Sequence, residues 1–332
     1  MTARALSTPG RLNLRSVGSF HIGGQRKTLQ GLPVEQVRLA VGAAARSVDP
    51  NGSYVSGQMY VQYYLQQQSL SPWPIVLWHG GGMTGANWES TPDGRPGWLQ
   101  RLLESGLDVY VCDAVERGRA GWSRWPDIYQ HPPLFRTMEE GWDMFRIGPA
   151  LTHGLKEAKA YVGQQFPTEA FEAFAAQWVP RWADHEAITL QAYEALLEKI
   201  GPCVLIAHSQ GGGLALSMAT RRPDLLKAVV AIEPSGAPQE LPQGPACPAY
   251  LMVWGDHVHE HPVWRQYRAR VDEHQQQLSA IGAQAETLDL PQRGIAGNSH
   301  FPMLDRNSDQ VLDGILHWLT PLTLQPTQEL MK

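Results

Sequence analysis

The stretch Cys203-Val-Leu-Ile-Ala-His208-Ser209-Gln210-Gly211-Gly212-Gly213 decides the fold. Its first five residues are apolar and predict a buried strand, and the small residues after Ser209 predict a helix that begins at once. A serine on such a tight strand-to-helix turn has a strained backbone, and it needs small residues two positions away on either side. Ala207 and Gly211 meet that need, so Ser209 is predicted to be a nucleophile rather than a helix N-cap.

Short apolar runs that end in turn residues recur along the chain of 332 residues. Runs that are apolar on both faces and rich in Val and Ile are typical of central strands in a mostly parallel sheet. Because helical patterns alternate with them, the sequence predicts an α/β fold class with a sheet flanked by helices. The less periodic first 50 residues predict an antiparallel edge. The predicted strands are Met59–Leu65, Ile75–Trp78, Asp108–Cys112, Cys203–Ala207, Ala228–Ile232, Ala249–Trp254 and Ala285–Leu290, and the predicted helices are Trp98–Glu104, Gly211–Arg222, His261–Ile281 and Gln310–Leu319.

One connection between predicted strands is much longer than a crossover helix needs. It joins Cys112 to Cys203 through 90 residues, whereas roughly 30–40 would suffice. Helical spacing is present in Thr168–Trp178 and His185–Lys199 but not in Gly121–Pro149, which is rich in Trp, Pro and Arg. We therefore expect residues 1–120 and 201–332 to form the core, and residues 121–200 to form a crossover helix plus a cap.

The composition limits the class of protein. A net charge of −5 excludes a general nucleic-acid binder, which needs a basic surface against phosphates. No apolar run reaches the roughly 18–20 residues that span a bilayer, and Met1–Arg15 has no signal-peptide pattern. We expect a cytoplasmic location, or a periplasmic or secreted one if the sequence is that of a processed form. The spacing of Cys112, Cys203 and Cys247 offers neither a zinc site nor a disulfide framework, and the first two are expected to be buried.

A nucleophilic serine needs a base, because its hydroxyl is a poor nucleophile when unassisted. His300 lies in Gly297-Asn298-Ser299-His300-Phe301-Pro302, a turn-rich loop between the last predicted strand and the last predicted helix. From that loop its side chain can reach the carboxyl ends of the parallel strands. We therefore expect His300 to be the general base rather than a solvated histidine.

Two carboxylates compete to orient this imidazole. Asp256 follows the seventh strand of the predicted sheet, and Glu233 follows the sixth in Ala231-Ile232-Glu233-Pro234. Burying a carboxylate at the end of an apolar strand costs folding free energy unless the carboxylate is paired. This favours Glu233 as the residue that orients the imidazole. Asp256 could instead cap the loop that follows it. Both residues lie at the carboxyl edge of the sheet, so the sequence leaves Asp256 open as the alternative acid.

Backbone amides are the usual donors to the oxyanion that acyl transfer creates. One donor is expected from Gln210, the residue after the nucleophile. The second is expected from the loop Trp78-His79-Gly80-Gly81-Gly82-Met83-Thr84-Gly85, because glycines let the amides turn inward without a Cβ clash. This loop lacks both phosphate-binding glycine motifs. Gly81 or Gly82 is therefore the predicted second donor.

The segment Asp256-His257-Val258-His259-Glu260-His261 superficially resembles a metal site. Alternate histidines point the same way only in an extended chain, and this segment lies in a loop that leads into a helix. We expect it to form a polar rim of the pocket. Neither a metal nor an organic cofactor is predicted.

Together these residues resemble the α/β-hydrolase fold from about Met59 to Leu319. More narrowly, the chain is similar to a subgroup of dimeric bacterial esterases, and it departs from them at Gly81-Gly82, where the subgroup has adjacent cysteines joined to each other. The resemblance implies Glu233 as the triad acid, a cap between strands four and five, and a homodimer. It rests on His208-Ser209-Gln210-Gly211-Gly212, Trp254-Gly255-Asp256-His257, Gly297-Asn298-Ser299-His300, Leu304-Asp305-Arg306-Asn307 and Gly18-Ser19-Phe20-His21-Ile22-Gly23-Gly24.

The expected function is that of a serine hydrolase with a small-molecule substrate. Ser209, His300 and Glu233 would cleave a carboxylic ester or lactone through an acyl-enzyme. An amidase or acyltransferase would use the same triad. A ligand-binding protein on a hydrolase scaffold is the alternative from another class, and the complete set of three residues argues against it.

Seven of the twelve tryptophans lie in segments expected around the acyl site. They favour a dry, apolar pocket for a bulky or aromatic substrate, and packing of the cap alone is an equal alternative. These seven are Trp78, Trp88, Trp122, Trp125, Trp142, Trp178 and Trp182. The candidate pocket residues are Met83, Trp88, Trp122, Trp125, Trp142 and Phe301.

Overall fold

The computed structural model describes residues 12–151, 154–244 and 247–323. The chain ends that we assigned to the core, residues 1–11 and 324–332, lie outside the described residues. The strands are β1 (Leu14–Leu29), β2 (Glu35–Val37), β3 (Arg46–Val48), β4 (Gly52–Gln66), β5 (Ile75–Trp78), β6 (Val109–Asp113), β7 (Cys203–His208), β8 (Leu226–Ile232), β9 (Ala249–Trp254) and β10 (Ala285–Asp289). The helices are α1 (Ala86–Glu89), α2 (Trp98–Glu104), α3 (Met138–Met144), α4 (Phe171–Ala175), α5 (Glu186–Ile200), α6 (Gln210–Arg221), α7 (Pro262–Ala280) and α8 (Ser308–Thr323). Short 3-10 turns are η1 (Gly118–Ala120), η2 (Leu155–Glu157), η3 (Thr168–Ala170), η4 (Pro223–Leu225) and η5 (Pro291–Arg293).

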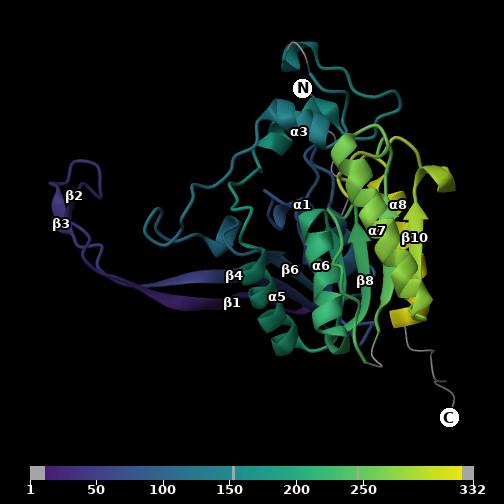
Figure 1. The fold of residues 1–332 in the computed structure, drawn as a ribbon, viewed down its shortest axis with the longest axis horizontal. Coiled ribbons are helices and arrows are strands. Elements are labelled where there is room, and N and C mark those ends of the chain that lie inside the picture. Colours follow the sequence, from purple (N-terminus) through teal and green to yellow (C-terminus); the bar gives the residue numbers. More distant parts are fainter. Residues whose placement is uncertain (1–11, 152–153, 245–246, 324–332) are drawn as a thin grey trace.

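Eight of these strands form one twisted sheet, in the order β1-β4-β6-β5-β7-β8-β9-β10 (Figure 1). β1 pairs with β4 and β4 with β6 in the antiparallel sense, and every other pairing is parallel. The predicted α/β class and the antiparallel edge are therefore confirmed. The parallel strands end at one edge of the sheet, and this edge carries the candidate site.

The sheet is buried on both faces because its central strands carry apolar side chains in both directions. Val204 and Ile206 pack on the face covered by α2 and α8, while Cys203 and Leu205 pack on the face covered by α5, α6 and α7. Burial of each such aliphatic side chain contributes about 1.5–3 kcal/mol to the free energy of folding. The two apolar layers therefore hold the strands, and with them the carboxyl ends of the strands, in fixed positions. Both Cys112 and Cys203 are free and buried, as the sequence predicted.

The long connection between β6 and β7 contains α3, α4 and the crossover helix α5. We call residues 121–185 the cap segment; Figure 1 shows it above the carboxyl ends of the strands. The expectation that 121–149 lacks helix is wrong, because α3 forms there. Thr137 caps it by accepting a hydrogen bond from the Glu140 amide, and seven residues are too few to show a clear apolar stripe.

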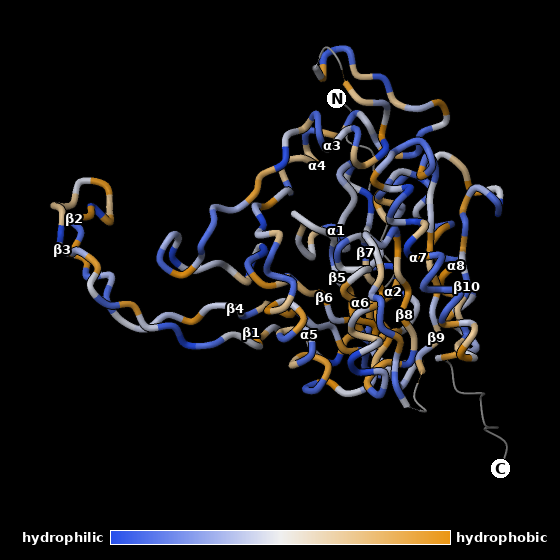
Figure 2. The backbone as a smooth tube through the Cα atoms, viewed as in Figure 1, coloured by the Kyte–Doolittle hydropathy of each residue, from blue (hydrophilic) through white to orange (hydrophobic). Residues whose placement is uncertain are grey.

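β1 and β4 run beyond the sheet as a two-stranded arm. They pair from Leu14 with Gln66 to Leu29 with Gly52, whereas only the part of β4 from Tyr60 to Tyr64 also pairs with β6. The small β2–β3 hairpin forms the tip of the arm (Figure 1). Figure 2 shows hydrophobic positions at this tip, far from the core; among them are the exposed side chains Val34, Leu39 and Val41. None of the described helices is both long and apolar enough to cross a bilayer.

Candidate active site

Ser209 occupies the turn between β7 and α6 with a strained backbone, at φ 55° and ψ −118°. A non-glycine residue in such a region costs about 1–3 kcal/mol, which the surrounding structure must offset. Two backbone hydrogen bonds hold the turn: the Ser209 amide donates to the Ile232 carbonyl at 2.9 Å, and the Ser235 amide donates to the Ser209 carbonyl at 3.0 Å. The side chain of Ser209 is therefore presented at the carboxyl edge of the sheet.

The glycines around Ser209 are required by close approaches. A Cβ on Gly211 would lie 2.5 Å from the His79 carbonyl oxygen, and one on Gly80 would lie 3.0 Å from Ser209 Cβ. A Cβ on Gly212 would meet Pro234 at 3.1 Å. The serine turn and the loop after β5 are thus packed backbone against backbone.

His300 and Glu233 meet in the buried space beside this turn. Glu233 directly follows β8 with a positive φ of 50°, and its Oε2 lies 3.4 Å from His300 Nδ1. Their side chains are only 0% and 1% exposed. Burial lowers the pKa of His300 well below its usual 6.5, and the nearby cation of Arg146 lowers it further. His300 is consequently neutral at pH 7 and can accept a proton.

His208, the residue before Ser209, connects the turn to the histidine loop. Its Nε2 donates to the His300 carbonyl at 2.7 Å, and the two imidazole rings are 4.5 Å apart. Burial lowers the pKa of His208 well below 6.5, so this ring is also neutral. In the described part of the chain, Ser209 Oγ itself makes no hydrogen bond.

Asp256 holds the backbone of the histidine loop and does not contact the imidazole. Its Oδ2 accepts hydrogen bonds from the amides of Gly297 at 2.8 Å and Asn298 at 3.0 Å. No hydrogen bond joins Asp256 to His300 within the described ranges. The structure thus places the two competing carboxylates in different positions: Glu233 against the ring, and Asp256 under the loop.

The glycine-rich loop after β5 is fixed at both ends. The His79 imidazole donates from Nδ1 to the Gly80 carbonyl at 2.8 Å, and its Nε2 accepts from the Ala114 amide at 2.9 Å. Burial lowers the pKa of His79 to about 4, which keeps this ring neutral. At the far end, the Asp113 carboxylate accepts from the Gly85 amide at 2.7 Å.

Three backbone amides at this point have no acceptor among the described residues: those of Gly81, Gly82 and Gln210. The Gly82 carbonyl, by contrast, accepts from the Val179 amide of the cap segment at 2.9 Å. Unpaired amides beside a nucleophile are the arrangement that stabilises an oxyanion. The cap segment helps to fix their direction.

Arg146 is a site residue that sequence reasoning missed. It follows α3 and is 1% exposed; its Nη2 donates to Glu233 Oε1 at 2.7 Å, and its Nε donates to the Asp256 carbonyl at 2.7 Å. Glu233 Oε1 also accepts from the Gly255 amide at 2.6 Å. A buried carboxylate needs such partners, because an unpaired charge is strongly disfavoured. The available signal was a single cation among apolar residues in Met144-Phe145-Arg146-Ile147.

The two residues before Arg146 also attach the cap segment to the site. The Met144 carbonyl accepts from Trp264 Nε1 at 2.5 Å, and the Phe145 carbonyl accepts from the His300 amide at 2.9 Å. The Phe145 ring stacks on the His300 ring at 5.8 Å. Three consecutive residues of the cap segment therefore support the imidazole and its carboxylate.

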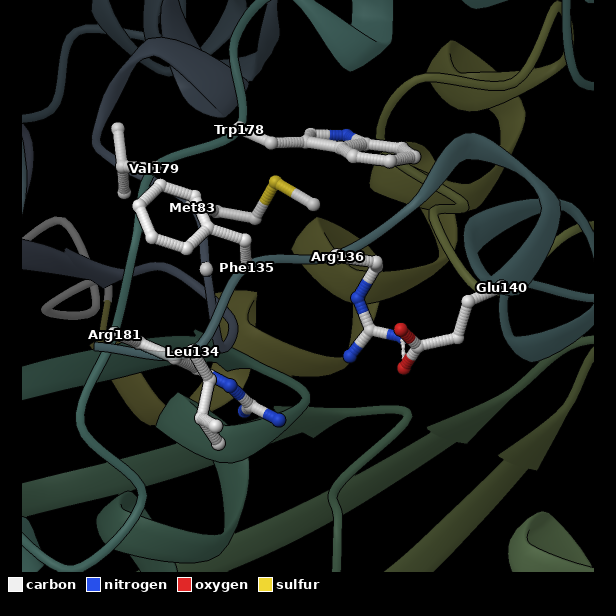
Figure 3. A pocket seen from close by; sticks show the side chains of 9 residues that line it. Met83, Leu134, Phe135, Arg136, Glu140, Trp178, Val179 and Arg181 are labelled. Atoms are coloured by element: carbon white, nitrogen blue, oxygen red, sulfur yellow. Dashed lines mark hydrogen bonds and ion pairs between the residues drawn. The ribbon is translucent and has the colours of Figure 1, made fainter. Parts of the chain in front are cut away.

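A cavity of about 250 Å³ opens between the glycine-rich loop and the cap segment (Figure 3). Of the six predicted pocket residues, only Met83 lines it, and the tryptophan that lines it is Trp178. Charged side chains are also present, so the lining is not the purely apolar one that we expected. The lining residues are Gly82, Met83, Leu134, Phe135, Arg136, Glu140, Trp178, Val179 and Arg181.

The other predicted pocket residues pack elsewhere. Trp142 and Phe301 belong to an aromatic cluster formed largely by the cap segment, Trp142 against Phe171 at 5.2 Å and Phe301 against Phe145 at 4.8 Å.

Trp88 packs against Trp98 in the core, while Trp122 and Trp125 are about half exposed on the outside of the cap segment. The sequence could not separate these roles, because the cap segment has little periodic structure.

The histidine-rich segment after β9 places two of its imidazoles beside carboxylates. His257 Nδ1 lies 2.9 Å from Glu260, and His261 lies 3.6 Å from Asp143. Across the three described ranges, no group of three or more metal-ligating side chains comes together.

Comparisons with known proteins identify the fold and the family of the chain. Residues 147–282 match a family model described as "Putative esterase". A solved structure of a novel bacterial esterase is similar over 96% of this chain and 99% of its own, with a TM-score of 0.80 and 31% sequence identity. The curated "Probable secreted lipase phiG" of Fungal sp. (strain ATCC 74256) is 29% identical over 325 residues, covering 81% of this chain and 87% of that protein. The sheet is that of the α/β-hydrolase fold, and the chain belongs to the esterases that have this fold.

Proposed function

We propose that the protein hydrolyses carboxylic esters through an acyl-enzyme, with Ser209 as nucleophile, His300 as base and Glu233 as the carboxylate that orients the base. The observation that carries this proposal is the buried His300 ring, which has Glu233 Oε2 at 3.4 Å from its Nδ1 and lies 4.5 Å from the ring of His208, the residue before the strained Ser209. A neutral imidazole with a buried carboxylate on one nitrogen can take a proton on the other.

The proposed reaction proceeds in two steps. Ser209 Oγ forms a bond to the carbonyl carbon while its proton passes to His300 Nε2; the ester C–O bond then breaks, and the leaving alkoxide takes that proton. In the second step, His300 accepts a proton from water while the water oxygen bonds to the acyl carbon; the bond between that carbon and Ser209 Oγ then breaks, His300 returns the proton to Oγ, and the acid is released. Catalytic hydrogen bonds often tighten only when substrate binds, so the contact of Ser209 Oγ with His300 is expected in the complex.

The negative charge that develops on the carbonyl oxygen needs donors. Gln210 and either Gly81 or Gly82 supply them in this proposal, because no acceptor in the described ranges pairs with their amides and the loops that carry them are packed together. Removing one such donor typically costs about 10²–10³ in kcat.

Two observations support Glu233 over Asp256 as the acid. Glu233 contacts the imidazole, whereas both hydrogen bonds of the Asp256 carboxylate hold the backbone of the histidine loop. Asp256→Asn would therefore affect the position of the loop, and Glu233→Gln would affect the base itself.

We also propose that two copies of the chain assemble into a dimer through the arm. Three apolar side chains at the tip, Val34, Leu39 and Val41, are at least half exposed. A second copy would bury such side chains. The resemblance to dimeric esterases points the same way.

The test of the catalytic proposal is hydrolysis of a panel of esters and lactones of different acyl and alcohol size. Ser209→Ala should lower turnover by about three orders of magnitude or more. Ser217→Ala is the matched control, because Ser217 lies on the same helix and, among the described residues, its hydroxyl donates only to the Gly213 carbonyl. Near wild-type turnover by Ser209→Ala would refute the proposal. Analysis of products with added amines and alcohols separates an esterase from an amidase or an acyltransferase.

A further inference from the structure

The cavity beside the glycine-rich loop has two chemically different sides. Met83, Phe135 and Trp178 form an apolar side, and the guanidinium groups of Arg136 and Arg181 point into the space below them (Figure 3). An ordinary lipid-like ester would use only the apolar side. A cavity with both sides suits a ligand that is apolar at one end and anionic at the other.

The two arginines differ in their charge balance. Arg136 Nη1 lies 2.5 Å from Glu140 Oε1, so its charge is neutralised within the cavity wall. Arg181 forms no ion pair with any described residue, and the nearby cations of Arg117 and Arg136 repel it. The cavity wall therefore carries one uncompensated positive charge, on Arg181. Partly buried arginines are normally paired, because the guanidinium fork matches a carboxylate.

Arg181 is also held beside the reacting centre. Its backbone forms a two-way bridge with Leu134, with hydrogen bonds of 2.7 and 3.1 Å, which fixes the start of the side chain. A Cβ placed on Gly81 would meet Arg181 Nη1 at 2.2 Å and Gln210 Oε1 at 3.0 Å. The guanidinium thus lies next to two of the residues that we assign to oxyanion stabilisation.

We propose that Arg181 binds a carboxylate on the substrate, so that the enzyme prefers esters that carry a free carboxylate near the scissile bond. This inference rests on the proposed function for the cleavage itself. The carboxylate belongs to either the acyl or the alcohol part of the ester, because both parts adjoin the oxyanion. The apolar side of the cavity receives the rest of that part.

The kinetic test uses two matched pairs of esters. For the acyl part, these are mono-para-nitrophenyl adipate and its methyl ester; for the alcohol part, they are para-acetoxybenzoate and its methyl ester. In at least one pair, kcat/KM for the acid should exceed that for the neutral ester by about tenfold, which corresponds to 1.4 kcal/mol. Arg181→Gln should abolish this preference and Arg181→Glu should reverse it, while Arg181→Lys should retain part of it.

Arg265→Gln is the control, because Arg265 is exposed on α7 and should leave the preference unchanged. A neutral ester that is preferred in both pairs would overturn the inference. So would an Arg181→Gln variant that loses activity equally on the acid and the neutral ester, because that result assigns Arg181 to general oxyanion stabilisation.

A binding measurement separates this inference from the catalytic proposal. Calorimetric titration of Ser209→Ala with phenylpropionate and with the neutral phenylpropionamide needs no turnover. The carboxylate should bind at least about tenfold more tightly than the amide, and the difference should vanish in Ser209→Ala/Arg181→Gln. Equal binding of both compounds to Ser209→Ala would overturn the role of Arg181 even if ester hydrolysis is observed. If Ser209→Ala binds the carboxylate more tightly than the amide but the wild-type protein hydrolyses no ester, the result would refute the proposed catalytic mechanism and leave the role of Arg181 standing.

Discussion

Single residues at this site are tuned by their buried neighbours. His300 is kept neutral by burial, and Arg146 opposes its protonation while pairing with Glu233. The same arginine thus balances the charge of Glu233, the proposed acid, and lowers the pKa of His300, the proposed base. Since the base works only when it is neutral, the pH dependence of activity reports directly on this arrangement.

Arg146→Met should move the acid limb of kcat/KM to higher pH. The wild-type limb lies at the pKa of His300, below 6.5, and activity is lost as the pH falls through it. Removing the cation raises the pKa of His300, so activity disappears at a higher pH. Arg146→Lys retains the charge and should keep a limb near that of the wild type. The measurement is a kcat/KM profile from pH 4 to pH 9, and an unchanged acid limb in Arg146→Met would contradict the role of Arg146.

The Arg146→Met variant should also lose about 3–5 kcal/mol in the free energy of unfolding, because the Glu233 carboxylate loses a buried partner.

Glu233→Gln should reduce kcat more than Asp256→Asn does. A glutamine cannot balance the imidazolium that forms during the reaction, and losses of about 10³–10⁴ are typical of such changes. Asp256→Asn keeps an oxygen acceptor for the amides of Gly297 and Asn298, so its effect should be at least about tenfold smaller. Steady-state kinetics on one chromogenic ester decide the matter, and a larger loss in Asp256→Asn would make Asp256 the acid.

At the scale of elements, the loop of residues 297–301 carries the proposed base and is held by the buried carboxylate of Asp305. Asp305 accepts from Asn298 Nδ2 at 3.0 Å, from the Ser299 amide at 2.8 Å and from Ser299 Oγ at 2.7 Å. Burial raises the pKa of Asp305 to about 7, against the opposing effect of these hydrogen bonds. The loop thus depends on one side chain for three of its contacts.

Asp305→Ala should therefore lower both stability and turnover. It leaves three buried donors without their acceptor, at about 1–3 kcal/mol each, so we expect a loss of about 3 kcal/mol or more in the free energy of unfolding. Urea denaturation measures this loss. Asp309→Ala is the control, because Asp309 is exposed and forms only a surface ion pair with Arg101. An Asp305→Ala variant as stable as that control would show that the loop is held by other contacts.

The central elements could be predicted from sequence more fully than the cap segment. β9 and α2 coincide with the predicted ranges, because a short continuous apolar run marks a strand buried on both faces and an amphipathic helix has a periodic apolar pattern. Ser209, His300 and Glu233 follow strands of this sheet, so topology alone brings them to one edge. Arg146 and Arg181 could not be placed, because they lie in irregular chain whose path is set by tertiary contacts such as the Leu134–Arg181 bridge.

The whole molecule combines a compact sheet domain with a projecting arm. The paired strands of the arm are fixed by backbone hydrogen bonds along their length, but nothing in the described chain covers the apolar side chains at the tip. Exposed apolar clusters of this kind usually mark an interface. The proposed dimer would give these exposed side chains a partner, so the arm is where the proposed assembly is tested.

Leu39→Asp/Val41→Asp should shift the protein from dimer to monomer without unfolding it. Both side chains are well exposed in the single chain, so the substitutions should change the free energy of unfolding little. Burying the new charges in an apolar interface would instead make dimer formation unfavourable. Sedimentation velocity over a range of concentrations measures the mass. Val162→Asp, a fully exposed position in the cap segment, is the control. A wild-type protein that sediments as a monomer, or a double variant that dimerises like the wild type, would contradict the proposed interface.

The most direct test of the catalytic proposal is covalent labelling with an organophosphonate ester, followed by peptide mass spectrometry. The probe reacts only with a serine whose base and oxyanion donors are aligned. We predict one label per chain, on the peptide that contains Ser209, with labelling lost in Ser209→Ala and retained in Ser217→Ala. A folded protein that takes up no label, or carries it on another residue, would contradict the assignment of Ser209 as the nucleophile.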